Sequence, residues 1–156
     1  MNEFTAKKLG EVLAFAEVGK ETWLKGQTAL ESVFEEERVA EVITANGHHA
    51  EIIRSMAEEN SVSEIVLKKL EGTGTKLRQM RDLYVGDQWD NPTELLEWSG
   101  FFEGAAVVHW SLVGGAGEAS GKSDMQSLAE TGKDFHEDLL SSAIDLLHET
   151  GKKKAS

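Results

Sequence analysis

The sequence predicts an all-α protein that folds as one up-and-down bundle of four or five helices. Apolar residues recur at the helical spacing of about 3.6 in every long segment, and no segment alternates apolar and polar residues as a strand does. Proline, which interrupts helices, occurs once in 156 residues, at Pro92. The length and a hydrophobic content of 40% suit a single core. We therefore expect one bundle domain over residues 1 to 151 and a disordered basic tail over residues 152 to 156.

The first helix is expected over residues 5 to 34. Its apolar positions fall on alternating steps of three and four residues, as in the seam of a helical bundle; they are Leu9, Leu13, Ala16, Trp23, Leu30 and Phe34. A neighbouring stripe contains several small residues, among them Gly19 and Gly26. This stripe indicates that another helix approaches closely there.

The next two helices are expected over residues 36 to 60 and from residue 61 onward. Asn46-Gly47 is a strong turn signal within the first of them, so the pattern allows either one helix or two. Ser61 and Glu64 have the spacing of a capping box, which predicts a helix start there. Gly72-Thr73-Gly74 indicates a turn or kink, and the apolar pattern then resumes until about residue 85 at Leu77, Met80, Leu83 and Tyr84.

Asn91-Pro92 marks the clearest helix start in the chain, because asparagine caps helices and proline fits the first helical position. The helix that follows is apolar on nearly every face, which predicts the central, buried member of the bundle. We expect it to end at the glycine-rich residues 114 to 117. Ser123 to Gln126 has the form of a second capping box, so the last helix is expected from Ser123 to about Thr150.

The composition argues against several classes of partner and environment. The net charge of −12 opposes the counterion release that dominates nucleic-acid binding. The most apolar stretch, residues 95 to 119, carries Glu97 and Glu103, which are costly within a membrane, so we expect a buried helix and no membrane segment. The absence of cysteine and of a signal-peptide pattern predicts a soluble protein of the reducing cytoplasm.

Three of the five histidines lie on or beside the apolar stripes of different helices. If His49, His109 and His136 met in the core with Glu51, Glu17 or Glu103, they would form a site for a divalent transition metal. The alternative is that each histidine is a structural residue of the core or its boundary, since histidine is of intermediate burial. Carboxylates pair by chance on any helix face of so acidic a chain, so no catalytic residue is assigned.

Glu103 stands alone among apolar neighbours. Placed inward, its carboxylate has to find a partner or accept a raised pKa. Placed outward, beside Ser99 and Gly100, it marks the one wetted face of its helix. The sequence leaves both placements open.

Residues 116 to 123 match the relaxed pattern of a phosphate-binding loop, with Gly121, Lys122 and Ser123 as its end. In such loops backbone amides and the lysine bind phosphates while the hydroxyl binds magnesium. The loop needs a parallel sheet around it, whereas only helical patterns follow Ser123. A connection between two helices is therefore the preferred interpretation.

These patterns favour an interaction or structural protein that associates with itself or with a protein partner. The long first helix contains Trp23 and Phe34, and the chain has four tryptophans. A bundle of this size does not always bury so many large apolar side chains, so an exposed apolar surface is expected. A metal-binding protein or metal-dependent enzyme is the alternative, and nucleotide binding is a distant third.

Overall fold

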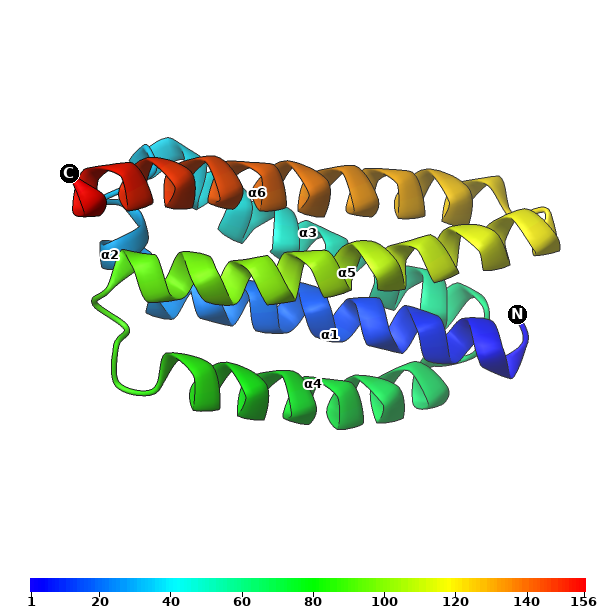
Figure 1. Ribbon diagram of the computed structural model, residues 1–156. Coiled ribbons are helices and arrows are strands. Elements are labelled where there is room, and N and C mark those ends of the chain that lie inside the picture. Colours follow the sequence, from blue (N-terminus) through cyan, green and yellow to red (C-terminus); the bar gives the residue numbers. More distant parts are fainter.

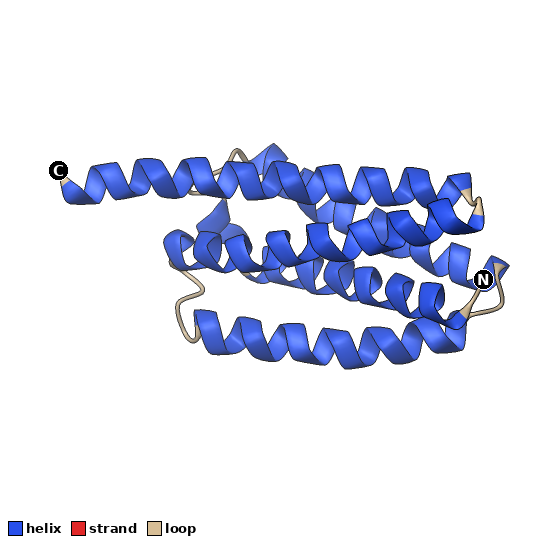
Figure 2. Ribbon diagram, turned by 45° about the vertical axis from the view of Figure 1, so that its right-hand side comes forward, coloured by secondary structure: helices blue, strands red, loops and turns tan.

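The computed structural model describes all 156 residues, and every regular element in it is a helix (Figure 1, Figure 2). The chain forms one short helix and five long ones: α1 (Glu3–Lys25), α2 (Gln27–Leu30), α3 (Glu36–Glu59), α4 (Ser63–Val85), α5 (Pro92–Ser120) and α6 (Ser123–Ala155). The five long helices alternate in direction along the chain. The predicted all-α, up-and-down bundle in a single domain is confirmed.

The centre of the bundle is α1, which packs against α3, α4 and α5, while α6 packs along α5 (Figure 1). Fourteen residues of α1 are buried, including Leu9, Val12, Leu13 and Phe15. The prediction that α5 is the central helix is wrong, because α5 lies at the surface with one side turned to solvent. Apolar residues on every face show that a helix needs cover all round, and they do not show which element covers it.

A helix boundary was predicted correctly where residues next to it in the sequence determine it. The Asn91 side chain accepts a hydrogen bond from the backbone N–H of Thr93, at 3.0 Å, so the predicted cap is confirmed. The single first helix is wrong, since α1 ends at Lys25 and α2 follows Gly26. A Cβ on Gly26 would lie 2.7 Å from a terminal methyl of Leu95, so α5 passes close to the chain at this break.

Several predicted helix breaks lie within continuous helices, and two predicted capping boxes do not form. The turn signal at Asn46 fails because its side-chain amide donates to the carbonyl of Val42 inside an unbroken α3. Helix α4 continues through residues 72 to 74, and α5 continues through residues 114 to 117. Neither predicted capping box forms, because the residues that precede α4 and α6 make no side-chain cap hydrogen bond. In α6 the Asp124 carboxylate accepts from the backbone N–H of Met125 instead, at 2.8 Å.

Glycines at helix crossings let the helices approach closely. A Cβ on Gly10 of α1 would lie 2.7 Å from Cβ of Lys69 in α4, and one on Gly132 of α6 would lie 2.4 Å from the Trp110 ring of α5. Gly19 similarly faces Asn46 of α3, so the predicted close approach along the small-residue stripe is confirmed.

The last turns of α6 project beyond the other helices (Figure 2). This projecting end includes the three exposed lysines at 152 to 154, because α6 continues to Ala155. The disordered tail over these residues stays a prediction. None of the helices combines the length and the apolar character needed to span a membrane.

Candidate functional site

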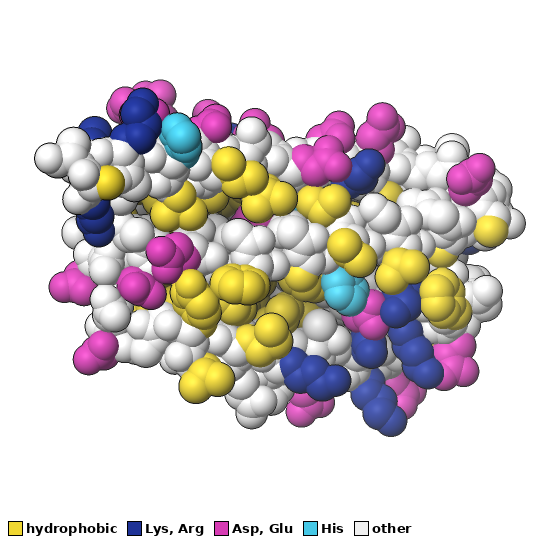
Figure 3. Space-filling view, viewed as in Figure 1, with side chains coloured by type: hydrophobic (Ala, Val, Ile, Leu, Met, Phe, Trp, Pro, Cys, Tyr) yellow, Lys and Arg dark blue, Asp and Glu magenta, His cyan; other side chains and the backbone are white.

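Apolar atoms gather over α4 and α5 on the face of the bundle shown in Figure 3. Of the ten large apolar side chains that are exposed, we group seven from α1, α4 and α5. We call them the outer face: Phe4 from α1; Met80, Leu83 and Tyr84 from α4; Phe101, Val108 and Leu112 from α5. Leu83 is 87% exposed and Phe101 is 61% exposed. Met80, Leu83 and Tyr84 continue the apolar pattern of α4, but only Leu77 of that pattern is buried, because α4 packs mainly on α1 and barely meets α5.

The outer face contains two shallow hollows. One, of about 440 Å³, lies between α4 and α5, and all of its lining residues are apolar or aromatic: Met80, Leu83, Tyr84, Trp98 and Phe101. The other, of about 380 Å³, lies beside Phe4 and Leu112. Both hollows follow the same side of α5, so the outer face extends along most of that helix.

The ring of Tyr84 connects the two helices across the first hollow. Its centroid lies 5.3 Å from that of Phe101 and 6.2 Å from that of Trp98. Its hydroxyl donates to a carboxylate oxygen of Glu97 at 3.1 Å. Burial first, and the hydrogen bond to Glu97 next, raise the pKa of Tyr84.

The two ends of the outer face carry opposite charges (Figure 3). Glu94 and Glu97 lie in the first two turns of α5, next to Phe101 and Tyr84. At the other end, beside Val108 and Leu112, basic side chains of α1 and α4 surround one buried carboxylate, that of Glu11.

Glu11 accepts from Lys8 at 3.0 Å, Lys69 at 3.1 Å and His109 Nδ1 at 2.9 Å. Burial alone raises the pKa of Glu11, but the hydrogen bonds from Lys8, Lys69 and His109 outweigh burial, so its pKa lies below the usual range. Sequence reasoning missed this residue. The available signal was a carboxylate within the most deeply buried stretch of apolar residues.

A second polar group lies inside the bundle, where α3, α5 and α6 meet. Glu103 and His136 are almost fully buried, and the carboxylate contacts His136 Nδ1 directly. Of the two placements open for Glu103, the inward one with a partner is therefore observed. His49 lies nearby against the rings of Trp110 and Phe135, with its Nδ1 unpaired. Burial lowers the pKa of His49 to about 4.

The structure does not bring the predicted metal ligands together. His109 pairs with Glu11, and His136 pairs with Glu103. His49 packs against two aromatic rings, and its Nδ1 has no hydrogen-bond partner. Glu51 is exposed on α3, and Glu17 pairs with Arg54. No group of three or more His, Asp or Glu side chains is placed to hold a metal ion.

The residues of the phosphate-loop pattern form a tight turn between two helices. Residues 116 to 120 belong to α5, Gly121 adopts the left-handed conformation that ends it (φ 64°), and Ser123 begins α6. The Lys122 amine donates to the side-chain oxygen of Asn60 at 2.7 Å. The lysine therefore ties this turn to the end of α3.

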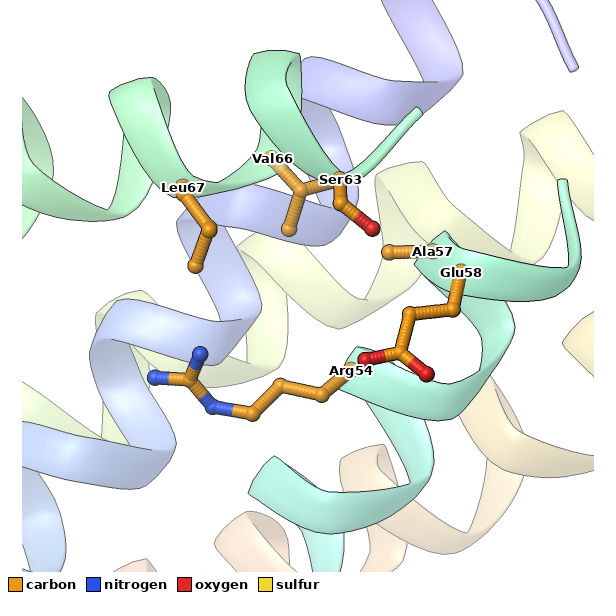
Figure 4. A pocket seen from close by; sticks show the side chains of 6 residues that line it. All are labelled: Arg54, Ala57, Glu58, Ser63, Val66 and Leu67. Atoms are coloured by element: carbon orange, nitrogen blue, oxygen red, sulfur yellow. The ribbon is translucent and has the colours of Figure 1, made fainter. Parts of the chain in front are cut away.

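The far side of α4 differs from the outer face. There a hollow of about 60 Å³ lies between α3 and α4, with Leu67 and Val66 facing Arg54 and Glu58 (Figure 4). It offers room for about two water molecules. Leu67 is 43% exposed, so it provides an apolar reference position on α4 away from the outer face.

Comparisons with protein-family models, with curated proteins and with solved structures found no match to this chain.

Proposed function

We propose that this chain is an association protein that forms a homodimer through the outer face. One observation carries the proposal: α5 is apolar on nearly every side, yet its outward residues Phe101, Val108 and Leu112 remain 61%, 61% and 41% exposed. A helix that is apolar all round is normally buried. A second copy of the chain would supply the missing cover.

The size of the outer face supports a stable interface. Taking about 180 Å² for a fully exposed large side chain, its seven exposed fractions leave on the order of 700 Å² in contact with water. The largest apolar patch on a typical monomer is about 300–600 Å². A standard protein interface buries about 800 Å² on each partner, so the outer face with its polar rim is large enough.

The buried polar side chains of the interior support a structural role for this protein rather than a metal-dependent reaction. Glu103 and His136 are paired with each other through a carboxylate oxygen and Nδ1. Their helices, α5 and α6, form the most extensive helix–helix contact in the bundle. Glu11 of α1 likewise accepts from Lys69 of α4 and His109 of α5, and its single charge offsets only one of the two lysine charges beside it. These contacts fix the helices that carry the outer face, and we assign them that role.

Sedimentation velocity of the natural chain and of two matched variants tests the proposal. We expect the natural chain to sediment as a dimer at tens of micromolar and to dissociate on dilution. Leu83→Glu should weaken dimerisation by about 100-fold or more, because a lost leucine burial costs about 1.5–3 kcal/mol and occurs twice in a symmetric dimer. Leu67→Glu, the same change on the far side of α4, should leave the dimer intact.

A natural chain that stays monomeric at hundreds of micromolar would contradict the proposal. A dimer that withstands Leu83→Glu but dissociates with Leu67→Glu would contradict it as well, since association would then use the far side of α4.

A further inference from the structure

We infer that two copies of this chain pair with their α5 helices antiparallel, crossing near Gly104 and Ala105. This inference rests on the proposed homodimer and adds the orientation and register of the two subunits. Three features of the outer face support it: its charge distribution, the glycines along α5 and the position of its aromatic side chains.

The charges of the outer face favour the antiparallel orientation. Glu94 and Glu97 lie at one end, and Lys8, Lys69 and His109 surround Glu11 at the other. Acidic and basic side chains occupy opposite ends of this face in Figure 3. Parallel helices would place acidic end against acidic end and basic end against basic end. Antiparallel helices place each acidic end against the partner's basic end, and complementary charges fix orientation in this way.

Glycines along α5 leave room for a close partner. A Cβ built on Gly100, Gly104 or Gly115 meets no atom of the chain within 4 Å, in contrast to Gly10 and Gly132, which fit close helix crossings. Glycine inside a helix costs about 1 kcal/mol relative to alanine, and at these three positions no contact within the chain offsets that cost. A second helix approaching along this side would offset it, because small residues let helix axes come close.

The side chains of the outer face set the register. Glu97 and Leu112 mark the acidic and basic ends of the face on α5, and their midpoint lies between Gly104 and Ala105. An antiparallel pair centred there sets Phe101 of one copy opposite Val108 of the other. The large ring then packs against a smaller side chain, which suits the interdigitation of packed helices.

Disulfide trapping tests the orientation directly, because the chain has no cysteine and each variant therefore carries a single thiol. In the antiparallel pair, Ala105→Cys lies beside its own copy, within the Cα separation of about 7 Å that a disulfide can span. Leu112→Cys lies about 20 Å from its own copy, by the rise of a helix. Leu112→Cys instead faces residue 97 of the partner.

Under mild oxidation we expect Ala105→Cys to form a covalent dimer and Leu112→Cys alone to form none. A mixture of Leu112→Cys with Glu97→Cys should form the mixed dimer. Leu67→Cys, on the far side of α4, should remain uncrosslinked and controls for random collision.

Self-crosslinking of Leu112→Cys as fast as that of Ala105→Cys would overturn the antiparallel orientation and leave the homodimer standing. A dimer in sedimentation in which neither Ala105→Cys nor the mixture crosslinks faster than Leu67→Cys would overturn the pairing through α5. A chain that sediments as a monomer would contradict the proposed homodimer itself. Failure of the homodimer and failure of the antiparallel α5 pairing therefore give different results.

Discussion

Acidification to pH 5 should destabilise the fold through His49, which is buried with an unpaired ring nitrogen. Its pKa is lowered from 6.5 to about 4 in the folded chain, first by burial and then by the charges of His136 and His48. The unfolded chain therefore binds a proton at His49 at a higher pH than the folded chain does. The stabilisation from this residue is complete above pH 6.5 and is lost as the pH falls toward 4.

Linkage gives the size of the effect. A difference of about 2.5 pH units corresponds to about 3 kcal/mol once the transition is complete, and about 2 kcal/mol of it is lost between pH 7 and pH 5. The carboxylates with lowered pKa, Glu3, Glu11 and Glu21, lose their contribution as the pH falls through and below their ordinary pKa of 4.5. The interval from pH 7 to pH 5 therefore lies above the titration of these carboxylates, and comparison with a His49 variant isolates that histidine.

Urea unfolding at pH 7 and pH 5 measures the loss. The natural chain should lose about 2 kcal/mol more of its unfolding free energy than His49→Gln does over this interval. His48→Gln removes an exposed neighbour whose charge is the smallest cause of the shift, so it should lose nearly as much as the natural chain. If the natural chain and His49→Gln lost stability in parallel, burial of a neutral His49 would not be the cause.

Three further substitutions have defined outcomes in the same assay. Gly132→Ala should destabilise by about 1–3 kcal/mol, because its Cβ would overlap the rigid Trp110 ring, and an unchanged midpoint would contradict that crossing. Glu103→Ala should cost about 3–5 kcal/mol by leaving His136 buried without its partner; a loss below about 1 kcal/mol would contradict a buried pair. Lys122→Ala should cost about 1 kcal/mol or less, and no melting shift with ATP and magnesium should depend on this lysine, since its amine is already bound to a side chain.

The helices were predictable from the sequence because their apolar periodicity is local. The start of α5 at Asn91-Pro92 was predictable for the same reason, since both residues act within one turn. The break at Gly26 was not predicted, and there the chain lies close to Leu95 of a distant helix. The capping box at Ser61 failed because that residue adopts a positive φ of 55° in the connection before α4.

The candidate site was predictable only in its parts. Glu103 could be singled out by its apolar neighbours, but its pairing with His136 depends on how α6 lies against α5. The outer face was missed because Leu83 continues the helical pattern of Leu77, and periodicity alone does not distinguish a side that is covered by the chain from one left for a partner. Packing between distant elements decides both cases.

Amide chemical shifts recorded as the isotope-labelled chain is diluted test the association through the outer face most directly. We predict that the concentration-dependent shifts gather at residues 80 to 84 of α4 and 100 to 112 of α5, while α3 and the far side of α4 around Leu67 stay unchanged. Shifts that do not depend on concentration, or that gather on α3 instead, would contradict the outer face as the site of association.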